Sequence, residues 1–226
     1  MAKKTAQQFN AHAYALRPSD EPIEGPVLVA FDFDGTLTVK DSFKAFLAWR
    51  AGPVRYAFGL VRLLPAAIRY LFDHDRGRIK AAAVREYLRG VTRSQLETDA
   101  KVFAEKYAQK LFRPDALATW RRWRNKGARP VIVTASPDLI VAPFARGLGA
   151  DTLIGSELCF DDNDRITGDL VGANCRGAEK VRRLREVFGD DCHLVAAYGD
   201  TEGDREMLEM ADERGYRVFS ARPSAA

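Results

Sequence analysis

The stretch that decides the fold is residues 27–36, which read Val-Leu-Val-Ala-Phe-Asp-Phe-Asp-Gly-Thr. It opens with a continuous apolar run, which predicts a strand buried on both faces. The run ends abruptly at Asp32, and Asp34 follows two residues later, so an extended chain places both carboxylates at the same end of the strand. Ligands of open parallel sheets bind beyond the carboxyl ends of the strands. We therefore expect Asp32 and Asp34 to lie in the functional site.

Strand-like and helix-like patterns alternate along the rest of the chain. Short apolar runs predict further strands, a polar turn at 161–164 predicts a hairpin, and apolar residues at helical spacing predict helices. The expected strands are 130–134, 152–154, 157–160, 165–171, 193–198 and 216–219, and the expected helices are 137–146, 178–188 and 202–210. Such alternation is typical of a parallel sheet wound by right-handed crossovers.

The segment 41–127 reads as helical, with breaks at Gly52-Pro53, Gly90 and Arg113-Pro114. It is too long for a crossover between neighbouring strands, so we predict an all-helical cap inserted after the first strand. Residues 25–40 and 128–226 then form the α/β core, a Rossmann-like parallel sheet flanked by helices.

The N-terminal residues and the cysteines indicate a compartment. Residues 1–24 show no sustained periodicity, which predicts a flexible leader, and their first ten residues are too polar for a signal peptide. Cys159, Cys175 and Cys192 have no CxxC spacing and cannot all pair, so no disulfide framework is expected. We therefore predict a reducing, cytoplasmic location.

The net charge of +4 hides an uneven distribution along the 226 residues. Residues 40–130 contain 21 Lys and Arg against 8 Asp and Glu, a net +13, whereas the remainder contains 14 against 23, a net −9. The middle segment is therefore expected to meet something anionic, and nucleic acid, a phosphorylated substrate and an anionic membrane all fit. The stacking aromatic residues of a nucleic-acid-binding motif are missing, so no nucleic-acid partner is expected.

Distinctive polar residues lie at the expected carboxyl ends of the other strands. Thr134 ends the second strand, and Asp200 and Asp204 follow the strand at 193–198. With the two aspartates after the first strand, four carboxylates converge on one rim, where they would repel one another unless a cation lay among them. Oxygen ligands without His or Cys favour Mg²⁺ over zinc or copper. Lys180 lies in the first turn of an expected helix, where a cation opposes the helix dipole, which indicates a functional role.

These residues resemble the four signatures of the haloacid dehalogenase superfamily of aspartate-nucleophile phosphotransferases. The signatures appear in order as Asp32-Phe-Asp34-Gly-Thr36, then Thr134, then Lys180, then Gly199-Asp200-Thr-Glu-Gly-Asp204. The resemblance spans about residues 27 to 220.

The resemblance implies a role for each matching residue. Asp32 would be the nucleophile that forms an aspartyl-phosphate, and Asp34 would protonate the leaving oxygen and then activate water. Mg²⁺ would be held by Asp32, the main-chain carbonyl of Asp34, and Asp200. In the same way Thr134 and the main chain at Ala135 would bind phosphoryl oxygens, Lys180 would neutralise charge, and Asp204 would orient Lys180 or a metal-bound water.

The helical cap after the first strand resembles the phosphoserine-phosphatase-like branch, subfamily IB. That branch has a cap Glu for the substrate amine and a Ser-Gly-Gly second motif, whereas the matching positions here are Asp41 and Thr134-Ala135-Ser136. Both departures count against serine recognition, and the pattern looks closer to less characterised bacterial members and to a phosphatidylglycerophosphatase. From the residues alone, Asp41 is also a helix N-cap, and Ser136 is expected to cap the helix that follows.

The combined prediction is a Mg²⁺-dependent phosphatase that acts on a phosphomonoester, either a lipid phosphate such as phosphatidylglycerophosphate or a small metabolite. A phosphoserine phosphatase and a phosphomutase are the enzymatic alternatives. A basic module that binds membrane or nucleic acid is the alternative from a different class.

The cap carries one further pattern. Arg55, Arg62, Arg69 and Arg76 recur every seven residues, so on one helix they form a stripe, and mainly apolar residues lie between them. A basic stripe beside an apolar face fits peripheral contact with an anionic membrane. The same pattern also fits a cap bundle whose apolar face forms its own core. It does not fit a membrane-spanning helix, because each buried Arg costs about 2.5–3.5 kcal/mol.

Overall fold

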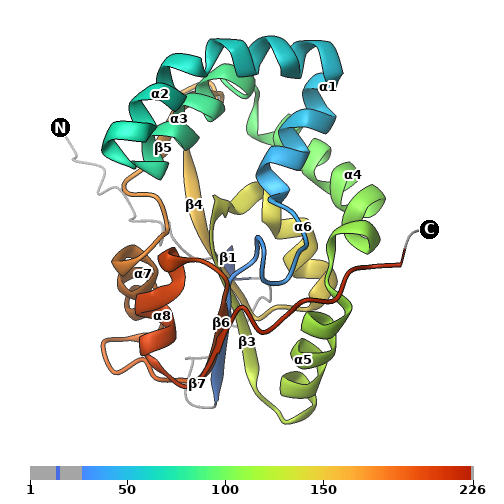
Figure 1. Cartoon of the computed structure of the whole chain (residues 1–226), viewed down its shortest axis with the longest axis vertical. Helices are drawn as coiled ribbons and strands as arrows, with labels where there is room; N and C mark the ends of the chain where they lie inside the picture. Colours follow the sequence, from blue (N-terminus) through green and yellow to red (C-terminus); the bar gives the residue numbers. More distant parts are fainter. Residues whose placement is uncertain (1–13, 16–26, 225–226) are drawn as a thin grey trace, which may run out of the picture.

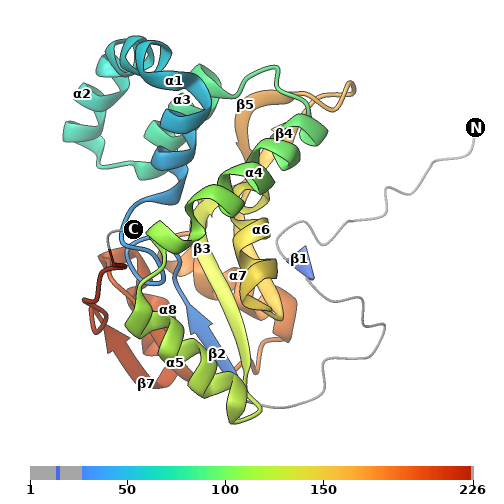
Figure 2. The ribbon, with the colours of Figure 1, turned by 90° about the vertical axis from the view of Figure 1, so that its right-hand side faces the viewer.

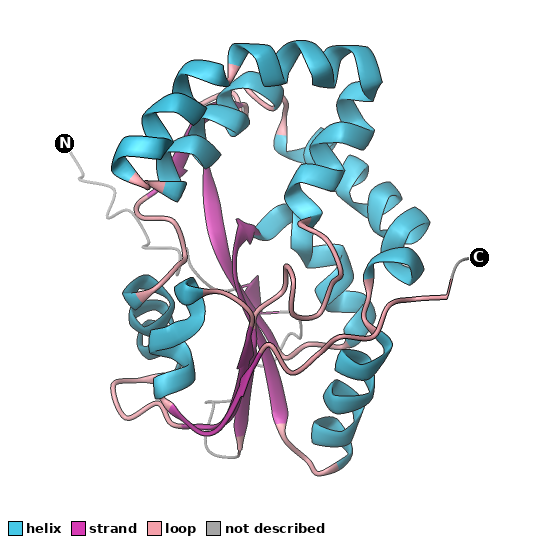
Figure 3. Cartoon of the chain, viewed as in Figure 1, coloured by secondary structure: helices cyan, strands magenta, loops and turns pink. Residues whose placement is uncertain are grey.

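The computed structural model describes residues 14–15 and 27–224. A mostly parallel sheet forms its centre, and helices pack on both faces (Figures 1 and 3). The strands are ordered β1-β4-β3-β2-β6-β7, with β5 paired to β4. Their bounds are β1 Tyr14–Ala15, β2 Leu28–Phe31, β3 Arg129–Pro137, β4 Thr152–Phe160, β5 Ile166–Val171, β6 Leu194–Gly199 and β7 Ala211–Tyr216. The predicted α/β fold with a Rossmann-like parallel sheet is confirmed.

Strand β2 lies at the point where the strand order reverses. It pairs in parallel with β3 on one side and with β6 on the other. The outer strands β4 and β7 also run parallel to their inner neighbours, whereas β1 and β5 pair antiparallel with β4. At such a reversal the connections leave in opposite directions, so a crevice opens beyond the strand ends.

The described residues form eight α-helices and one 3₁₀ helix. Their bounds are α1 Ser42–Arg62, α2 Leu64–Asp73, α3 Arg76–Tyr87, α4 Arg93–Leu111, α5 Pro114–Asn125, α6 Asp138–Leu148, α7 Ala178–Phe188, η1 Glu202–Asp204 and α8 Arg205–Glu209. Among these same residues, no helix combines the length and the apolar character that crossing a membrane requires.

Alternate side chains of the central strands build a core on each face of the sheet. Phe31 of β2 and Ile132 of β3 belong to one core cluster, and their neighbours Ala30 and Val131 belong to the other. This two-residue alternation is the geometry of strands buried on both faces. The first cluster continues into α4, α5, α6 and the cap, and the second into α7 and α8.

Helices α1, α2 and α3 cover the carboxyl ends of the strands (Figures 1 and 2). Helix α5, which also belongs to the segment predicted as the cap, packs on the sheet instead. The Trp120 ring lies 5.0 Å from the Phe31 ring, and Trp123 Nε1 donates to the Tyr198 hydroxyl at 2.9 Å. The segment 41–127 therefore contains both cap helices and a helix that supports the core.

Three further details differ from the sequence prediction. The last strand is β7 at 211–216 rather than 216–219, because this strand is mostly polar and gives no apolar run. The two strands expected at 152–154 and 157–160 form the single strand β4. The predicted leader lies outside the described residues, apart from Tyr14–Ala15, which form β1.

The four arginines of the predicted stripe lie on three helices. Arg55 and Arg62 belong to α1, Arg69 to α2 and Arg76 to α3. The prediction of one stripe was wrong at Arg76, because His74 adopts a left-handed conformation (φ 51°) that ends α2.

Candidate active site

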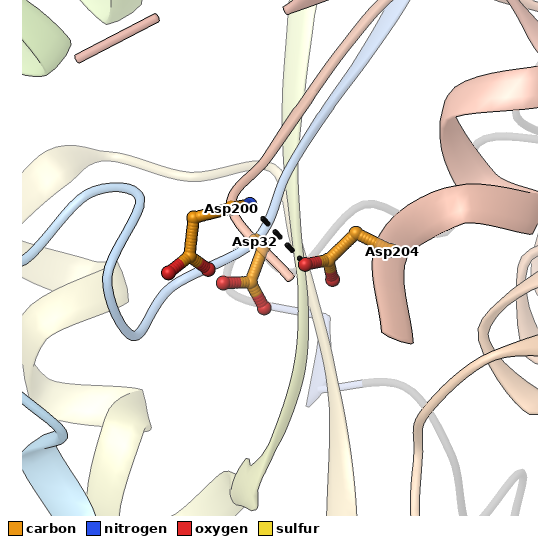
Figure 4. A group of neighbouring side chains, drawn as sticks. All are labelled: Asp32, Asp200 and Asp204. Carbon is orange, nitrogen blue, oxygen red and sulfur yellow. Dashed lines mark hydrogen bonds between the residues drawn. The ribbon is translucent and has the colours of Figure 1, made fainter. Parts of the chain in front are cut away.

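The carboxyl ends of β2 and β6 bring three aspartates together. Asp32 follows β2 directly, Asp200 follows β6, and Asp204 ends the short helix η1. The three side chains converge in Figure 4, and one carboxylate oxygen from each lies within 4.8 Å of the others. Of the four carboxylates that the sequence predicts at one rim, these three meet in this way, and Asp34 does not belong to the cluster.

Lys180, in the first turn of α7, joins two of these aspartates. Its Nζ donates to Asp32 Oδ1 at 2.7 Å, to Asp204 Oδ1 at 2.6 Å and to the Val133 carbonyl at 2.6 Å. Only 1% of its side chain is exposed. Burial alone would lower the pKa of Lys180, but the charges of Asp32 and Asp204 outweigh it and raise this pKa. Lys180 is therefore a permanent buried cation, held against the helix dipole by its two carboxylate partners.

The two carboxylate oxygens of Asp32 have different partners, because Oδ1 accepts from Lys180 and Oδ2 from Thr36. Its Oδ2 accepts a hydrogen bond from Thr36 Oγ1 at 3.2 Å, and its main-chain N–H donates to the Tyr198 carbonyl at 2.8 Å. Burial raises the pKa of Asp32 to about 7, although Lys180 acts in the opposite direction. Further positive charge beside Oδ2 would favour the ionised form that a nucleophile needs.

Asp34 is held by the end of β3 and by the start of α1. Ser136 Oγ donates to Asp34 Oδ2 at 2.5 Å, and the Ser42 N–H donates to Oδ1 at 2.6 Å. Burial raises the pKa of Asp34, followed by the charge of Asp41, and this favours a carboxyl that can carry a proton.

The position of Ser136 corrects the prediction that it caps the next helix. Strand β3 extends to Pro137 and α6 begins at Asp138, without a side-chain cap. As a cap the Ser136 hydroxyl would accept a hydrogen bond from a main-chain N–H, but here it donates to the buried Asp34 side chain instead.

Asp204 connects Lys180 to the loop that follows β6. Beside its contact with Lys180, its Oδ2 accepts from the Thr201 N–H and the Thr201 hydroxyl, both at 2.9 Å. Burial would raise the pKa of Asp204, but the charge of Lys180 together with the hydrogen bonds from Lys180 and Thr201 outweighs it and lowers this pKa. The Asp200 carboxylate accepts a longer hydrogen bond, from Thr36 Oγ1 at 3.5 Å. Burial together with the charge of Asp204 raises the pKa of Asp200.

Gly35 permits the close approach of Asp200 to the loop after β2. Its φ is +88°, and a Cβ at this position would lie 2.1 Å from Asp200 Oδ2. Both the backbone conformation and the space therefore require glycine here.

The remaining predicted site residues also line the crevice. Thr134 is buried, and its hydroxyl oxygen accepts from the Ser136 N–H at 3.1 Å. The Ala135 carbonyl accepts from the Lys80 ammonium and from Ser156 Oγ. Asp41 Oδ1 accepts from the Lys44 N–H at 2.9 Å. Asp41 is therefore the N-cap of α1, as the residues alone predict.

Lys80 is a site residue that the sequence pattern did not reveal. It reaches from α3 of the cap to the Ala135 carbonyl, so it joins cap and core. Burial lowers its pKa to about 8, against the opposing charges of Asp34 and Asp41. In the sequence it is one of 21 Lys and Arg in residues 40–130, with no motif to distinguish it.

A cavity of about 840 Å³ lies between the strand ends and the cap. Its core side carries the charged residues described above. Its cap side is mainly apolar and is formed by residues of α1, α2 and α3, among them Leu60, Leu63, Leu64, Ala67 and Ile79. The cavity therefore has one highly charged end and one apolar wall.

The residues present fit a divalent cation of the Mg²⁺ type. Asp32 and Asp200 offer hard oxygen donors that repulsion alone would drive apart, and no His or Cys belongs to the acidic cluster found in the described residues. The Asp34 carboxylate is engaged by Ser136 and Ser42, which leaves its main-chain carbonyl as the donor that the sequence prediction assigned.

Comparison with known proteins identifies the family. The profile of the haloacid dehalogenase-like hydrolase family matches residues 29–209. Protein CicA of Caulobacter vibrioides is 67% identical over 199 residues, which cover 88% of this chain and 89% of that protein. A protein of unknown function from Bordetella pertussis has a similar structure, with a TM-score of 0.65 at 21% identity, covering 80% of this chain and 85% of that one. A phospho-aspartyl intermediate analogue of phosphoserine phosphatase follows, with a TM-score of 0.57 at 20% identity, covering 86% and 90%.

The chain belongs to the haloacid dehalogenase-like hydrolase family. The resemblance inferred from the four motifs is thereby confirmed, and the chain shares its fold with phosphoserine phosphatase. It is an enzyme of the hydrolase class.

Proposed function

We propose that this hydrolase is a Mg²⁺-dependent phosphatase that cleaves a phosphomonoester through an aspartyl-phosphate on Asp32. The contact of buried Lys180 with Asp32 and Asp204 is the observation that carries the proposal. A buried cation between two carboxylates is costly to maintain for stability alone. At a site that receives phosphate, the same cation offsets the charge that accumulates during transfer.

In the first step an oxygen of Asp32 forms a bond to phosphorus, and the bond between phosphorus and the leaving-group oxygen breaks. Asp34 gives its proton to the leaving oxygen, so the product departs as a neutral alcohol. The raised pKa of Asp34 suits this role, because an acid must still hold its proton near neutral pH.

In the second step Asp34, now ionised, takes a proton from a water molecule. The water oxygen attacks phosphorus, the bond to Asp32 breaks, and inorganic phosphate leaves. Asp34 thereby regains the proton that it gave in the first step. The hydrogen bonds from Ser136 and Ser42 keep the Asp34 carboxyl in one orientation for both transfers.

The other residues bind the phosphoryl group or compensate its negative charge. Mg²⁺, held by Asp32, the Asp34 carbonyl and Asp200, would supply positive charge beside the phosphoryl oxygens. Thr134 and the main chain at Ala135 would bind the phosphoryl group, and Asp204 keeps Lys180 in position. This arrangement relies on positioning and electrostatics, as expected for phosphoryl transfer.

The cavity favours a leaving group with an apolar portion, such as a lipid phosphate, over phosphoserine. Its cap side is mainly apolar, and Lys80 adds a cation to the cavity that would repel the ammonium group of phosphoserine. Asp41, which could balance an ammonium, caps α1 instead. A panel of phosphatidylglycerophosphate, short-chain alkyl phosphates, sugar phosphates and phosphoserine tests this preference. A kcat/KM highest for phosphoserine would contradict it, and an isomerised sugar phosphate would indicate a phosphomutase.

Hydrolysis of p-nitrophenyl phosphate tests the chemistry. We expect turnover that requires Mg²⁺ and that falls at least about a thousandfold in Asp32→Asn, because the nucleophile is lost. Asp162→Asn, an exposed position in the β4–β5 turn, is the matched control and should keep wild-type activity. Full activity of Asp32→Asn, or turnover independent of divalent metal, would refute the mechanism.

A further inference from the structure

The outer side of α1 and α2 exposes large apolar side chains. Val54, Phe58, Val61, Ile68, Leu71 and Phe72, here called the outer face, are between 56% and 83% exposed. None of the 10 residues of α2 is buried. Single exposed apolar residues are common on soluble proteins, but a concentration of them marks an interaction surface.

These residues lie on one side of each helix. At about 100° per residue, Val54, Phe58 and Val61 of α1 fall within about 40° of a common direction, and Ile68, Leu71 and Phe72 of α2 fall within about 50° of another. Figures 1 and 2 place α1 and α2 at the end of the molecule away from α5. The face therefore points away from the core.

The outer face is continuous with the wall of the active-site cavity. Leu60 and Leu64 are 48% and 54% exposed, and both also line the cavity. The two helices are thus apolar on the inner and the outer side. A helix that is apolar nearly all round is normally covered on all sides, so the outer face requires an apolar partner.

The charge of this region selects the partner. Residues 42–72 contain five Lys and Arg and no Asp or Glu. The side chains of Arg62 and Arg69 are 68% and 71% exposed, more than those of their acidic partners Glu86 and Asp73. Two copies meeting through this face would bring their cations together, whereas an anionic lipid surface would attract them.

We propose that the outer face docks on an anionic phospholipid bilayer. Phe58, Ile68 and Phe72 enter the boundary between headgroups and acyl chains, and Arg62 and Arg69 lie against lipid phosphates. Docking places Leu60 and Leu64, which line the cavity and are about half-exposed, beside the membrane surface, and on the proposed function a membrane-borne substrate enters there. The docking is a property of this surface and does not depend on the reaction.

Co-sedimentation of the full chain with vesicles tests the proposal. We expect association with phosphatidylcholine vesicles that contain about one-third phosphatidylglycerol, and weaker association with phosphatidylcholine alone. Phe58→Ser with Phe72→Ser should lower the partition constant at least about tenfold, because two apolar anchors are removed. The matched control is Val102→Ser with Val218→Ser, which removes two exposed apolar side chains elsewhere and should not change the partition.

A second pair of variants tests the charges. Arg62→Gln with Arg69→Gln should weaken association with anionic vesicles, and the difference should shrink as salt screens charges beyond about 10 Å at 0.1 M. Lys101→Gln with Lys110→Gln, on α4, is the control and should behave as wild type.

Three outcomes would overturn the docking proposal. These are no association of the wild-type chain, equal losses in the test and control variants, or a dimer in analytical ultracentrifugation that the Phe58 and Phe72 substitutions dissociate. Hydrolysis of p-nitrophenyl phosphate should be unchanged in all docking variants, because the soluble ester needs no membrane. Absence of that hydrolysis in the wild type would refute the proposed function and leave the vesicle result standing.

Discussion

The hydroxyl of Ser136 is a positioning group for Asp34. Its hydrogen bond to Asp34 Oδ2 measures 2.5 Å, so Ser136→Ala would leave this oxygen without its donor. We expect kcat for p-nitrophenyl phosphate to fall about tenfold, equivalent to about 1.4 kcal/mol, which is within the range of one intramolecular hydrogen bond. KM should hardly change, because the Ser136 hydroxyl donates its proton to Asp34 and not to the substrate.

Steady-state kinetics of Ser136→Ala beside Ser94→Ala, an exposed serine on α4, provides the check. Wild-type kcat, or a rise in KM alone, would show that Ser136 binds substrate rather than positioning Asp34.

Lys80 gives the site a pH dependence of its own. Burial lowers its pKa to about 8, while Asp34, Asp41, Cys175 and Asp32 act in the opposite direction. Lys80 is therefore charged below about pH 8 and neutral above it, so we expect KM for an anionic substrate to rise as the pH increases through that value.

Replacement of Lys80 separates this effect from those of the other site residues. Lys80→Met should raise KM about tenfold at pH 7 and remove the increase above pH 8, whereas Lys80→Arg should keep a low KM to higher pH because arginine stays charged. Identical KM profiles of Lys80→Met and the wild type would exclude contact between Lys80 and the substrate.

The residues of the site divide into those with a local signal and those without. Asp32, Asp34 and Thr36 lie in one short motif after a strand, and their chain position already implies their meeting point. The contacts of Ser136 and Lys80 join positions 102 and 55 residues apart in the chain, so no local pattern indicates them. For Ser136 the local pattern favoured a helix cap, and a tertiary carboxylate overrode it.

At the scale of elements, helix α7 depends on a charged cluster beneath its first turns. Glu179 accepts hydrogen bonds from Arg182 and from Arg183, whose side chain is fully buried. The hydrogen bond from Arg182, together with the one from Arg183, lowers the pKa of Glu179 to about 2, although burial acts in the opposite direction. The folded state therefore prefers the ionised form of Glu179.

The sign of the pH effect follows from this lowered pKa. The stabilisation by Glu179 is present above its unfolded pKa of 4.5 and is lost as the pH falls towards 2. Glu179→Gln should lower the free energy of unfolding by about 2 kcal/mol at pH 7 and by much less near pH 2.5. Urea denaturation at both pH values measures the difference, and the exposed pair member Glu209→Gln should change it by less than about 0.5 kcal/mol. A Glu179→Gln effect that is equal at both pH values would contradict the assignment.

Helices and strands with a clear apolar pattern were predicted well from the sequence, and those without one were not. Strands buried on both faces, such as β2 and β3, appear as apolar runs, and Gly52 and Pro114 marked a real kink and a real helix start. The polar edge strand β7 has no such run and was displaced towards Tyr216. Helix α5 was assigned to the cap because periodicity identifies a helix but not the surface on which it packs.

At the scale of the whole molecule, the charge division of the chain corresponds to its architecture. The basic segment forms α1 to α5, and the acidic remainder supplies Asp200 and Asp204 at the rim below the cap. The phosphate end of a substrate therefore meets an acidic rim with the cap cation Lys80 nearby, and the rim needs a further cation before it can receive an anion.

Binding of that cation should stabilise the whole fold. Asp32, Asp200 and Asp204 are held together by folding and repel one another, so an ion that binds only the folded state shifts the unfolding equilibrium. With Mg²⁺ at about one hundred times its dissociation constant the gain is about 2.7 kcal/mol, which corresponds to a rise in Tm of about 5–10 °C for a chain of this size.

Asp200→Asn should abolish the rise, and it should raise the Tm of the metal-free protein because it removes one of the repelling charges. Thermal unfolding with MgCl₂, and with NaCl at equal ionic strength, measures the effect, and Asp162→Asn should respond as the wild type does. A Mg²⁺-dependent rise that persists in Asp200→Asn, or a wild-type Tm that Mg²⁺ leaves unchanged, would show that the acidic rim holds no metal.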